Sequence, residues 1–188
     1  AIAIGIGYHL ATKKIPLIYL QNSGLGNIIN PLVSLVDPDV YSIPMILLIG
    51  WRGEPGVKDE PQHLRQGRIT TGLLDVMKIP YEILSSETSS EESDQIVKRM
   101  VQQAFTLNAP CALLVKKGTF SSYKLKLDNY YDRDLYREQV IEIIINEISP
   151  DDIVVSTTGV ASRELFEYRT KKSHSHEKDF LTVGGMGH

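Results

Sequence analysis

Hydrophobic residues along this chain form short runs, and longer segments with helical spacing of apolar positions lie between them. The runs predict strands at residues 16–21, 44–51, 81–84, 110–116, 152–156 and 180–183. The segments between predict helices at residues 25–36, 63–77 and 90–106, with inward stripes at Leu73, Leu74, Met77, Ile96, Val97 and Met100. Strands that alternate with helices in this way are typical of βαβ units and of a parallel α/β sheet.

The pattern lapses between Lys116 and Arg133, where a Gly- and Ser-containing stretch leads into a polar, tyrosine-rich one. We interpret this stretch as a domain linker. An amphipathic helix at residues 134–148 follows, then a strand and the turn Thr157-Thr158-Gly159, which opens another helix. The sequence therefore predicts that a second α/β unit begins after the linker.

The composition is that of an ordinary globular protein: 188 residues, 42% hydrophobic, 23% charged, with a net charge of -3. The absence of a basic cluster argues against a nucleic-acid binder. The longest apolar run, residues 43–51, contains Pro44 and is too short for a membrane span. A single cysteine, Cys111, lies in an apolar run and has no disulfide partner, which favours a core thiol and a cytoplasmic location.

Both ends of the sequence have the character of internal segments. Residues 1–8 begin without Met or a helix cap in a small-residue helical pattern, and residues 184–188 form a glycine-rich turn. We therefore expect the chain to be part of a longer protein.

The turn after the first predicted strand is the first candidate for chemistry. An apolar strand breaks into Gln21-Asn22-Ser23-Gly24-Leu25-Gly26-Asn27 and restarts at once as a helix. In a parallel sheet the carboxyl ends of strands face the crevice where ligands bind, and glycines let backbone N–H groups approach a ligand. The alternative is an ordinary strand-to-helix turn.

The loop after the second predicted strand, residues 50–63, lies at the same sheet edge. It contains acidic and basic residues, one Trp, one His, two prolines and three glycines. A loop that is merely solvated does not need so many residues that restrict or redirect the backbone. Arg52 could grip a carboxylate or phosphonate, or bridge Asp59 or Glu60. His63 could be a proton donor, an anion ligand or a helix-start histidine. Lys58 is a further cationic candidate for an anionic substrate.

Motifs along essentially the whole chain resemble those of the phosphonopyruvate decarboxylases, thiamine-diphosphate enzymes related to sulfopyruvate decarboxylase. The resemblance lies in residues 21–30, 49–56, 58–63, 117–121, 156–166 and 184–188. It implies flavodoxin-like parallel sheets with helices on both faces. Residues 1–126 would form most of a pyrimidine-binding domain, and residues 127–188 the beginning of a similar diphosphate-binding domain.

The resemblance also implies roles for particular residues. Gln21, Asn22 and Ser23 would face the substrate. An anionic substrate next to a diphosphate also calls for cationic groups, for which Arg52, Lys58 and His63 are the candidates, with His63 also a candidate proton shuttle. Thiamine diphosphate would contact two groups of residues: Gly24, Leu25, Gly26 and Asn27 in the first domain, and Thr157, Thr158, Gly159, Gly185, Met186, Gly187 and His188 in the second. No metal ligand is predicted within the chain, because the family's magnesium-binding motif would follow His188. The activating glutamate would precede Ala1, so these residues alone should be inactive.

The implied activity is decarboxylation of 3-phosphonopyruvate, with thiamine diphosphate and magnesium, by a homodimer or larger homo-oligomer. The partner would be a small anionic 2-oxo acid. Two alternatives remain: decarboxylation of sulfopyruvate, and a noncatalytic flavodoxin-like module that binds an anion or regulates another protein.

Overall fold

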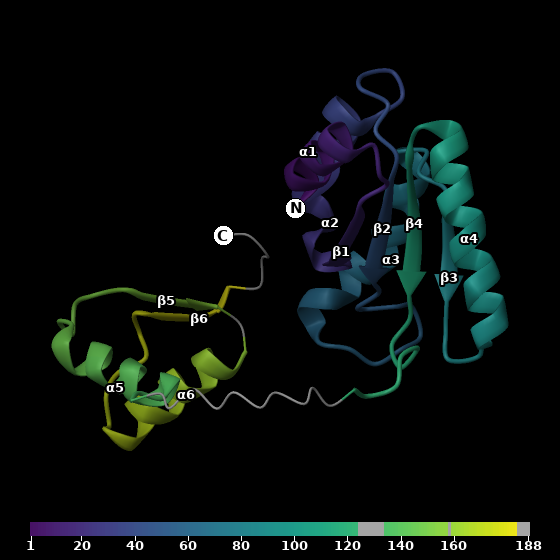
Figure 1. The fold of residues 1–188 in the computed structure, drawn as a ribbon. Helices are drawn as coiled ribbons and strands as arrows, with labels where there is room; N and C mark the ends of the chain where they lie inside the picture. Colours follow the sequence, from purple (N-terminus) through teal and green to yellow (C-terminus); the bar gives the residue numbers. More distant parts are fainter. Residues whose placement is uncertain (124–133, 158, 184–188) are drawn as a thin grey trace. The chain divides into compact units, whose positions relative to one another are not determined.

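The computed structural model describes residues 1–123, 134–157 and 159–183, shown as a ribbon in Figure 1. The chain divides into two compact units, with the boundary between Ser122 and Tyr123. Within the described residues, no helix has both the length and the apolar character needed to cross a membrane.

The first unit is a parallel α/β sheet, as the sequence predicted. Its four strands lie in the order β1-β2-β4-β3, and every neighbouring pair is parallel. The strands are β1 (Leu17–Gln21), β2 (Met45–Gly50), β3 (Tyr81–Leu84) and β4 (Pro110–Val115). The helices are α1 (Ile2–Thr12), α2 (Leu25–Pro31), α3 (Pro61–Val76) and α4 (Ser90–Leu107), with a 3-10 turn η1 (Asn22–Gly24) before α2.

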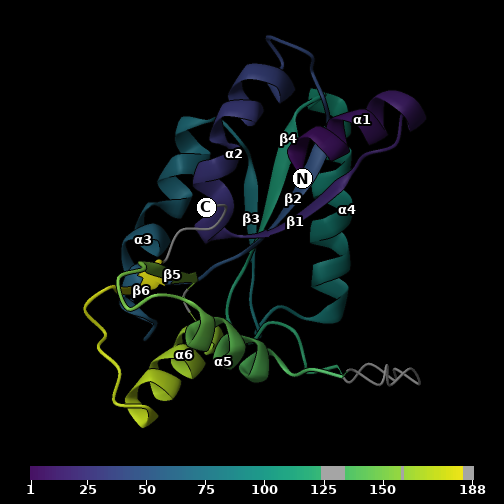
Figure 2. The same cartoon turned by 90° about the vertical axis from the view of Figure 1, so that its left-hand side faces the viewer.

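The two faces of this sheet bury separate apolar clusters, because successive side chains of a strand point to opposite faces. Met45, Leu47 and Ile49 of β2 pack with residues of α1, α2 and α3. Ile46 of the same strand packs instead with Met100 and other residues of α4. Figure 2 shows α2 and α3 on one side of the sheet and α4 on the other. Helices on both faces confirm the predicted fold class.

Only α4 covers the second face among the described helices, and part of that face is bare. Leu17 and Tyr19 of β1 are 61% and 77% exposed. An apolar groove lined by Leu17 runs between this face of the sheet and α4. Val97 lines this groove and is 39% exposed, so the prediction that it faces inward with Ile96 and Met100 was wrong. The helical spacing was right, but this side of α4 lines the groove and is not enclosed in the core.

The helix predicted at residues 25–36 also differs from expectation. Regular α-helix ends at Pro31, and the segment η2 (Leu32–Val36) continues as a π-helix. Proline has no N–H group to donate to the preceding turn, so the α-helical bonding pattern cannot pass through Pro31 unchanged. Leu32 and Val36 are nevertheless buried, which keeps the apolar stripe of this segment in the core.

Cys111 lies fully buried in β4, and burial raises the pKa of its thiol to about 11. A neutral thiol among apolar neighbours is a core residue, as the sequence indicated.

The second unit contains α5 (Arg137–Glu147), β5 (Val154–Thr157), α6 (Val160–Lys171) and β6 (Asp179–Val183), with β5 and β6 parallel. Among the described residues of this unit, Leu165 of α6 and Ile145 of α5 are the buried apolar ones. Arg169 of α6 forms an ion pair with Asp179 at the start of β6, and the nitrogen-to-oxygen distance is 2.9 Å. This unit therefore has the strand–helix–strand order predicted for the start of a second α/β unit.

Candidate ligand site at the carboxyl edge of the sheet

Asn22 joins the turn after β1 to the loop after β2. Its side-chain Nδ2 donates to the carbonyl oxygen of Arg52 at 2.8 Å and to Thr70 Oγ1 at 2.9 Å. The backbone N–H of Arg52 donates to Asn22 Oδ1 at 3.0 Å. Asn22 is fully buried, so its polar atoms are satisfied by protein alone. It does not face solvent in this structure and acts as a tie between β1, β2 and α3.

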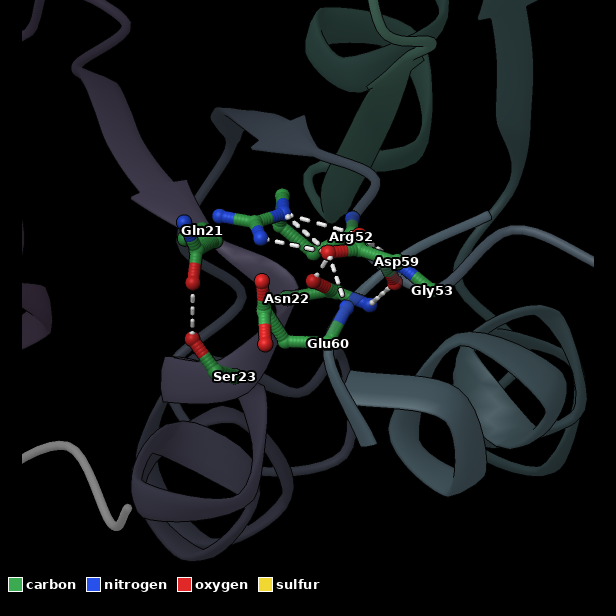
Figure 3. A network of polar contacts seen from close by, with 7 residues as sticks. All are labelled: Gln21, Asn22, Ser23, Arg52, Gly53, Asp59 and Glu60. Atoms are coloured by element: carbon green, nitrogen blue, oxygen red, sulfur yellow. Dashed lines mark hydrogen bonds and ion pairs between the residues drawn. The ribbon is translucent and has the colours of Figure 1, made fainter. Parts of the chain in front are cut away.

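Arg52 forms a two-point ion pair with Asp59 inside its own loop, so one of the partners proposed from the sequence is the actual one. Arg52 Nε lies 2.8 Å from Asp59 Oδ2, and Nη2 lies 2.5 Å from Oδ1. Asp59 also accepts from the backbone N–H groups of Gly53 at 2.7 Å and Glu60 at 2.8 Å. Figure 3 shows this network, with the remaining guanidinium nitrogen of Arg52 on the side of Gln21, away from Asp59.

The hydrogen bond from Arg52 is the main cause that holds the pKa of Asp59 well below its ordinary value, and the backbone N–H groups add to it. The same contact raises the pKa of Arg52. Asp59 therefore stays ionised throughout the neutral range and fixes the guanidinium in place.

Two glycines let this loop lie directly on helix α3. Gly53 has a φ of +67°, and a Cβ there would lie 1.9 Å from the carbonyl oxygen of His63. A Cβ on Gly67 would lie 1.8 Å from the carbonyl oxygen of Gly53. Trp51 Nε1 donates to the carbonyl oxygen of Gly67 at 3.0 Å. The glycine at position 53 of this loop, together with Gly67 of α3, thus allows the backbones of loop and helix to lie in close contact.

A hollow of about 200 Å³ opens at this edge, above β1, β2 and β4. Apolar and aromatic side chains form most of its wall, and Arg52, Lys116 and Lys117 supply positive charge; the lining also includes Tyr19, Gln21, Leu48, Trp51, Val115 and Phe120. Mostly apolar walls with a few polar groups are typical of small-molecule sites. The charge indicates an anionic ligand.

The structure brings only some of the predicted substrate residues to this hollow. Gln21 and Arg52 line it, and Ser23 contributes indirectly, because its hydroxyl donates to Gln21 Oε1 at 2.5 Å. Lys58 is exposed on the loop, and His63 is half-buried in the first turn of α3; neither lines the hollow. The backbone N–H of His63 donates to the carbonyl oxygen of Glu60 at 2.9 Å, as at an ordinary helix start.

The glycine turn predicted to bind cofactor has an open outer surface. No atom lies within 4 Å of the position that a Cβ would take on Gly24 or Gly26. Leu25 between them is 1% exposed and belongs to the core, while Asn27 is exposed. The turn therefore combines a buried anchor with backbone that a ligand can approach.

In the second unit, Gly159 has a φ of +128° and stands at the N-terminus of α6, two residues after Thr157, the last residue of β5. The backbone carbonyl of Thr157 accepts from the hydroxyl of Ser162. Five of the predicted cofactor residues lie outside the described residues: Thr158, Gly185, Met186, Gly187 and His188.

Sequence reasoning missed Lys116, Lys117, Tyr19 and Phe120 as site residues. Lys116 pairs with Glu54 across the edge, with 2.7 Å between Nζ and Oε1. The missed signal is the pair of lysines directly after β4, since the carboxyl ends of all four parallel strands meet at one edge.

Replacing Asp59 by Asn should lower the unfolding free energy by about 1–2 kcal/mol, because a charge-assisted network is lost at a partly solvated site. The folded pKa of Asp59 is lowered from 3.8, so its contribution is fully present above about pH 5 and is lost only in strong acid. The difference in urea-unfolding free energy between the two proteins should therefore shrink as pH falls below about 4. The exposed Asp94 of the Lys98 pair is the control, and Asp94→Asn should cost no more than about 0.5 kcal/mol.

A parallel α/β sheet with a cationic, partly apolar hollow at its carboxyl edge has the geometry of a site for a small anionic molecule. Comparison with known proteins places the chain more narrowly. No protein-family model matches it. The chain is 34% identical over 182 residues to a phosphonopyruvate decarboxylase of Streptomyces viridochromogenes, an alignment that covers 89% of this chain and 44% of that protein. A phosphonopyruvate decarboxylase of Streptomyces hygroscopicus is 32% identical over the same length, covering 89% of this chain and 43% of that protein.

A third relative, sulfopyruvate decarboxylase subunit alpha of Methanococcus maripaludis, is 34% identical over 114 residues, which cover 61% of this chain and 64% of that protein. The chain belongs to this family of phosphonopyruvate and sulfopyruvate decarboxylases, which confirms the resemblance seen in the motifs. It spans less than half the length of the two phosphonopyruvate decarboxylases.

Proposed function

We propose that this chain is part of a thiamine-diphosphate-dependent decarboxylase that converts 3-phosphonopyruvate to phosphonoacetaldehyde and carbon dioxide. The observation that supports it best is the extent of the alignments. Phosphonopyruvate decarboxylases match 89% of the chain, through both units, whereas a sulfopyruvate decarboxylase subunit alpha matches 61%, a length close to that of the first unit.

Residues 1–126 then serve as the pyrimidine-binding domain, and residues 127–188 begin the diphosphate-binding domain. The open backbone at Gly24 and Gly26 supports an approach of thiamine to that turn. At the start of α6, the N–H of Arg163 donates to the carbonyl oxygen of Gly159. The N–H groups that precede such a first helical bond have no acceptor within the helix, which suits a diphosphate. When bound, thiamine diphosphate supplies the electron sink for carbon–carbon bond cleavage.

Magnesium accompanies the diphosphate in this proposal. Nowhere in residues 1–123, 134–157 and 159–183 do three or more His, Cys, Asp or Glu side chains form a group that could hold a metal ion. No step is therefore assigned to this ion.

The chain's own residues bind and orient the substrate in this proposal. Gln21 and Arg52 contact the small anionic 2-oxo acid in the hollow, while Asn22 and Ser23 position them through the hydrogen bonds described above. His63 remains our proposed proton donor, and Lys58 a cationic residue at the entrance. A cofactor held between two chains requires a homodimer or a larger homo-oligomer.

The test is an assay of the full-length protein with thiamine diphosphate and magnesium, offered 3-phosphonopyruvate and sulfopyruvate in separate reactions. We expect carbon dioxide release that requires thiamine diphosphate, with the higher kcat/KM for 3-phosphonopyruvate. A higher kcat/KM for sulfopyruvate would establish the alternative substrate, which is favoured by a sulfopyruvate decarboxylase of Methanosarcina acetivorans that matches 99% of the chain at 25% identity. Release of carbon dioxide from neither acid would favour a noncatalytic binding module.

A further inference from the structure

Three basic side chains line the hollow at the carboxyl edge, and two of them are already paired within the protein. Arg52 is held by Asp59, and Lys116 by Glu54. Lys117 forms no ion pair or side-chain hydrogen bond with any residue that the structure describes, and it is exposed. Its ammonium group is therefore available to a ligand in a way that the Lys116 ammonium is not.

The register of the sheet places Lys117 and Arg52 at matching positions. Gly50, the last residue of β2, pairs with Val115, the last residue of β4. Arg52 and Lys117 each lie two residues beyond that pair, on neighbouring strands of one parallel sheet. Because Asp59 engages Nε and Nη2 of Arg52, its guanidinium can offer Nη1 to the hollow while staying fixed.

The chemistry of the hollow suits one doubly charged group beside an apolar stem. Tyr19, Leu48 and Phe120 supply an apolar wall, which weakens the competition of water for charges near it. A phosphonate resembles a phosphate monoester and carries close to two negative charges at neutral pH. A fixed guanidinium N–H donor and an unpaired, flexible ammonium suit such a group, and the ammonium adds a positive charge and three donors.

We infer that Lys117, together with Arg52, binds the phosphonate group of the substrate and so determines preference for a dianionic acid. The proposed function identifies the acid, but the anion site itself does not depend on that function. The guanidinium of Arg52 donates to the phosphonate from a fixed direction, because Asp59 holds it. The ammonium of Lys117 contacts the phosphonate from the loop that follows β4. Neither the motif resemblance nor the relatives' names assign a role to Lys117.

The test measures binding of phosphonoacetate, a non-reactive acid with a carboxylate and a phosphonate, by calorimetry with the full-length protein loaded with thiamine diphosphate and magnesium. We expect Lys117→Met to weaken binding by about 10- to 100-fold, the loss of one charge-assisted contact. Lys117→Arg should restore most of the affinity. Lys14→Met is the matched control, because Lys14 is an exposed lysine that precedes the amino end of β1, and it should bind like the parent protein.

Sulfoacetate, which carries one negative charge fewer, provides a second measurement. The Lys117→Met substitution should weaken the binding of sulfoacetate less than it weakens the binding of phosphonoacetate. Equal affinity of the parent and Lys117→Met for phosphonoacetate, or no binding by the parent, would overturn the inference. Decarboxylation of 3-phosphonopyruvate alongside unchanged affinity would leave the proposed function standing without this site. Binding that depends on Lys117 in a protein that releases no carbon dioxide would leave the site standing without the function.

Discussion

Replacing Gly67 by Ala should destabilise the first unit by about 3 kcal/mol or more and displace the loop of residues 51–60 from helix α3. The added Cβ would lie 1.8 Å from the carbonyl oxygen of Gly53 and 2.1 Å from its carbonyl carbon. Backbone atoms cannot rotate away as a flexible side chain can, so either the loop or the helix must move. Urea unfolding followed by tryptophan fluorescence measures the effect. The signal reports on this contact because Trp51 is the single tryptophan of the chain and its Nε1 donates a hydrogen bond to the carbonyl oxygen of Gly67.

Gly72→Ala in the same helix is the matched control. No atom lies within 4 Å of the position of its Cβ, and alanine forms helix better than glycine, so this variant should gain about 0.5–1 kcal/mol. The two substitutions add the same methyl group to one helix with opposite expected signs. Equal stability of the two variants would show that the loop does not lie against Gly67 as described.

The order and type of the elements were predictable because they depend on local pattern. Each strand is a short apolar run bounded by turn residues, and the observed β3 matches the predicted residues 81–84. Helix α3 begins at Pro61 rather than at His63, since proline is well suited to the first helical position. Such boundary differences do not move the site, because the strand ends at Gln21 and Gly50 set its position.

Tertiary features of the site were not predictable in the same way. The sequence indicated that Arg52 meets either a ligand or an acidic residue of its own loop, and only the folded loop identifies Asp59. The resemblance implied that Asn22 faces the substrate, and only the structure identifies its side-chain partners Arg52 and Thr70, which lie 30 and 48 residues away in the sequence. Lys117 could be assigned to the site only from the strand order β1-β2-β4-β3, in which β4 lies beside β2 and β3 forms the edge of the sheet.

Replacing Asn22 by Ala should lower the unfolding free energy of the first unit by about 3–5 kcal/mol. The backbone N–H and carbonyl of Arg52 would both lose a partner in a partly buried position, and a void would remain where the amide packs. Asn30→Ala is the control: Asn30 is an exposed asparagine of α2, and the change should stay within about 0.5 kcal/mol. Equal effects at the two positions would contradict the role given to Asn22.

Asn22→Asp separates the hydrogen-bond donors of this side chain from its shape. An ionised carboxylate would still accept from the N–H of Arg52, but it would face the carbonyl oxygen of Arg52 that the amide now donates to. Burial and that carbonyl both favour the protonated form, so the folded pKa of the introduced carboxyl group should lie above its ordinary value of about 3.9. The stabilisation that the protonated carboxyl group provides is then present at low pH and is lost as pH rises through the folded pKa. Relative to the parent, this variant should be weakest near pH 7 and recover toward pH 4, and a constant difference across that range would exclude a donor role for Asn22.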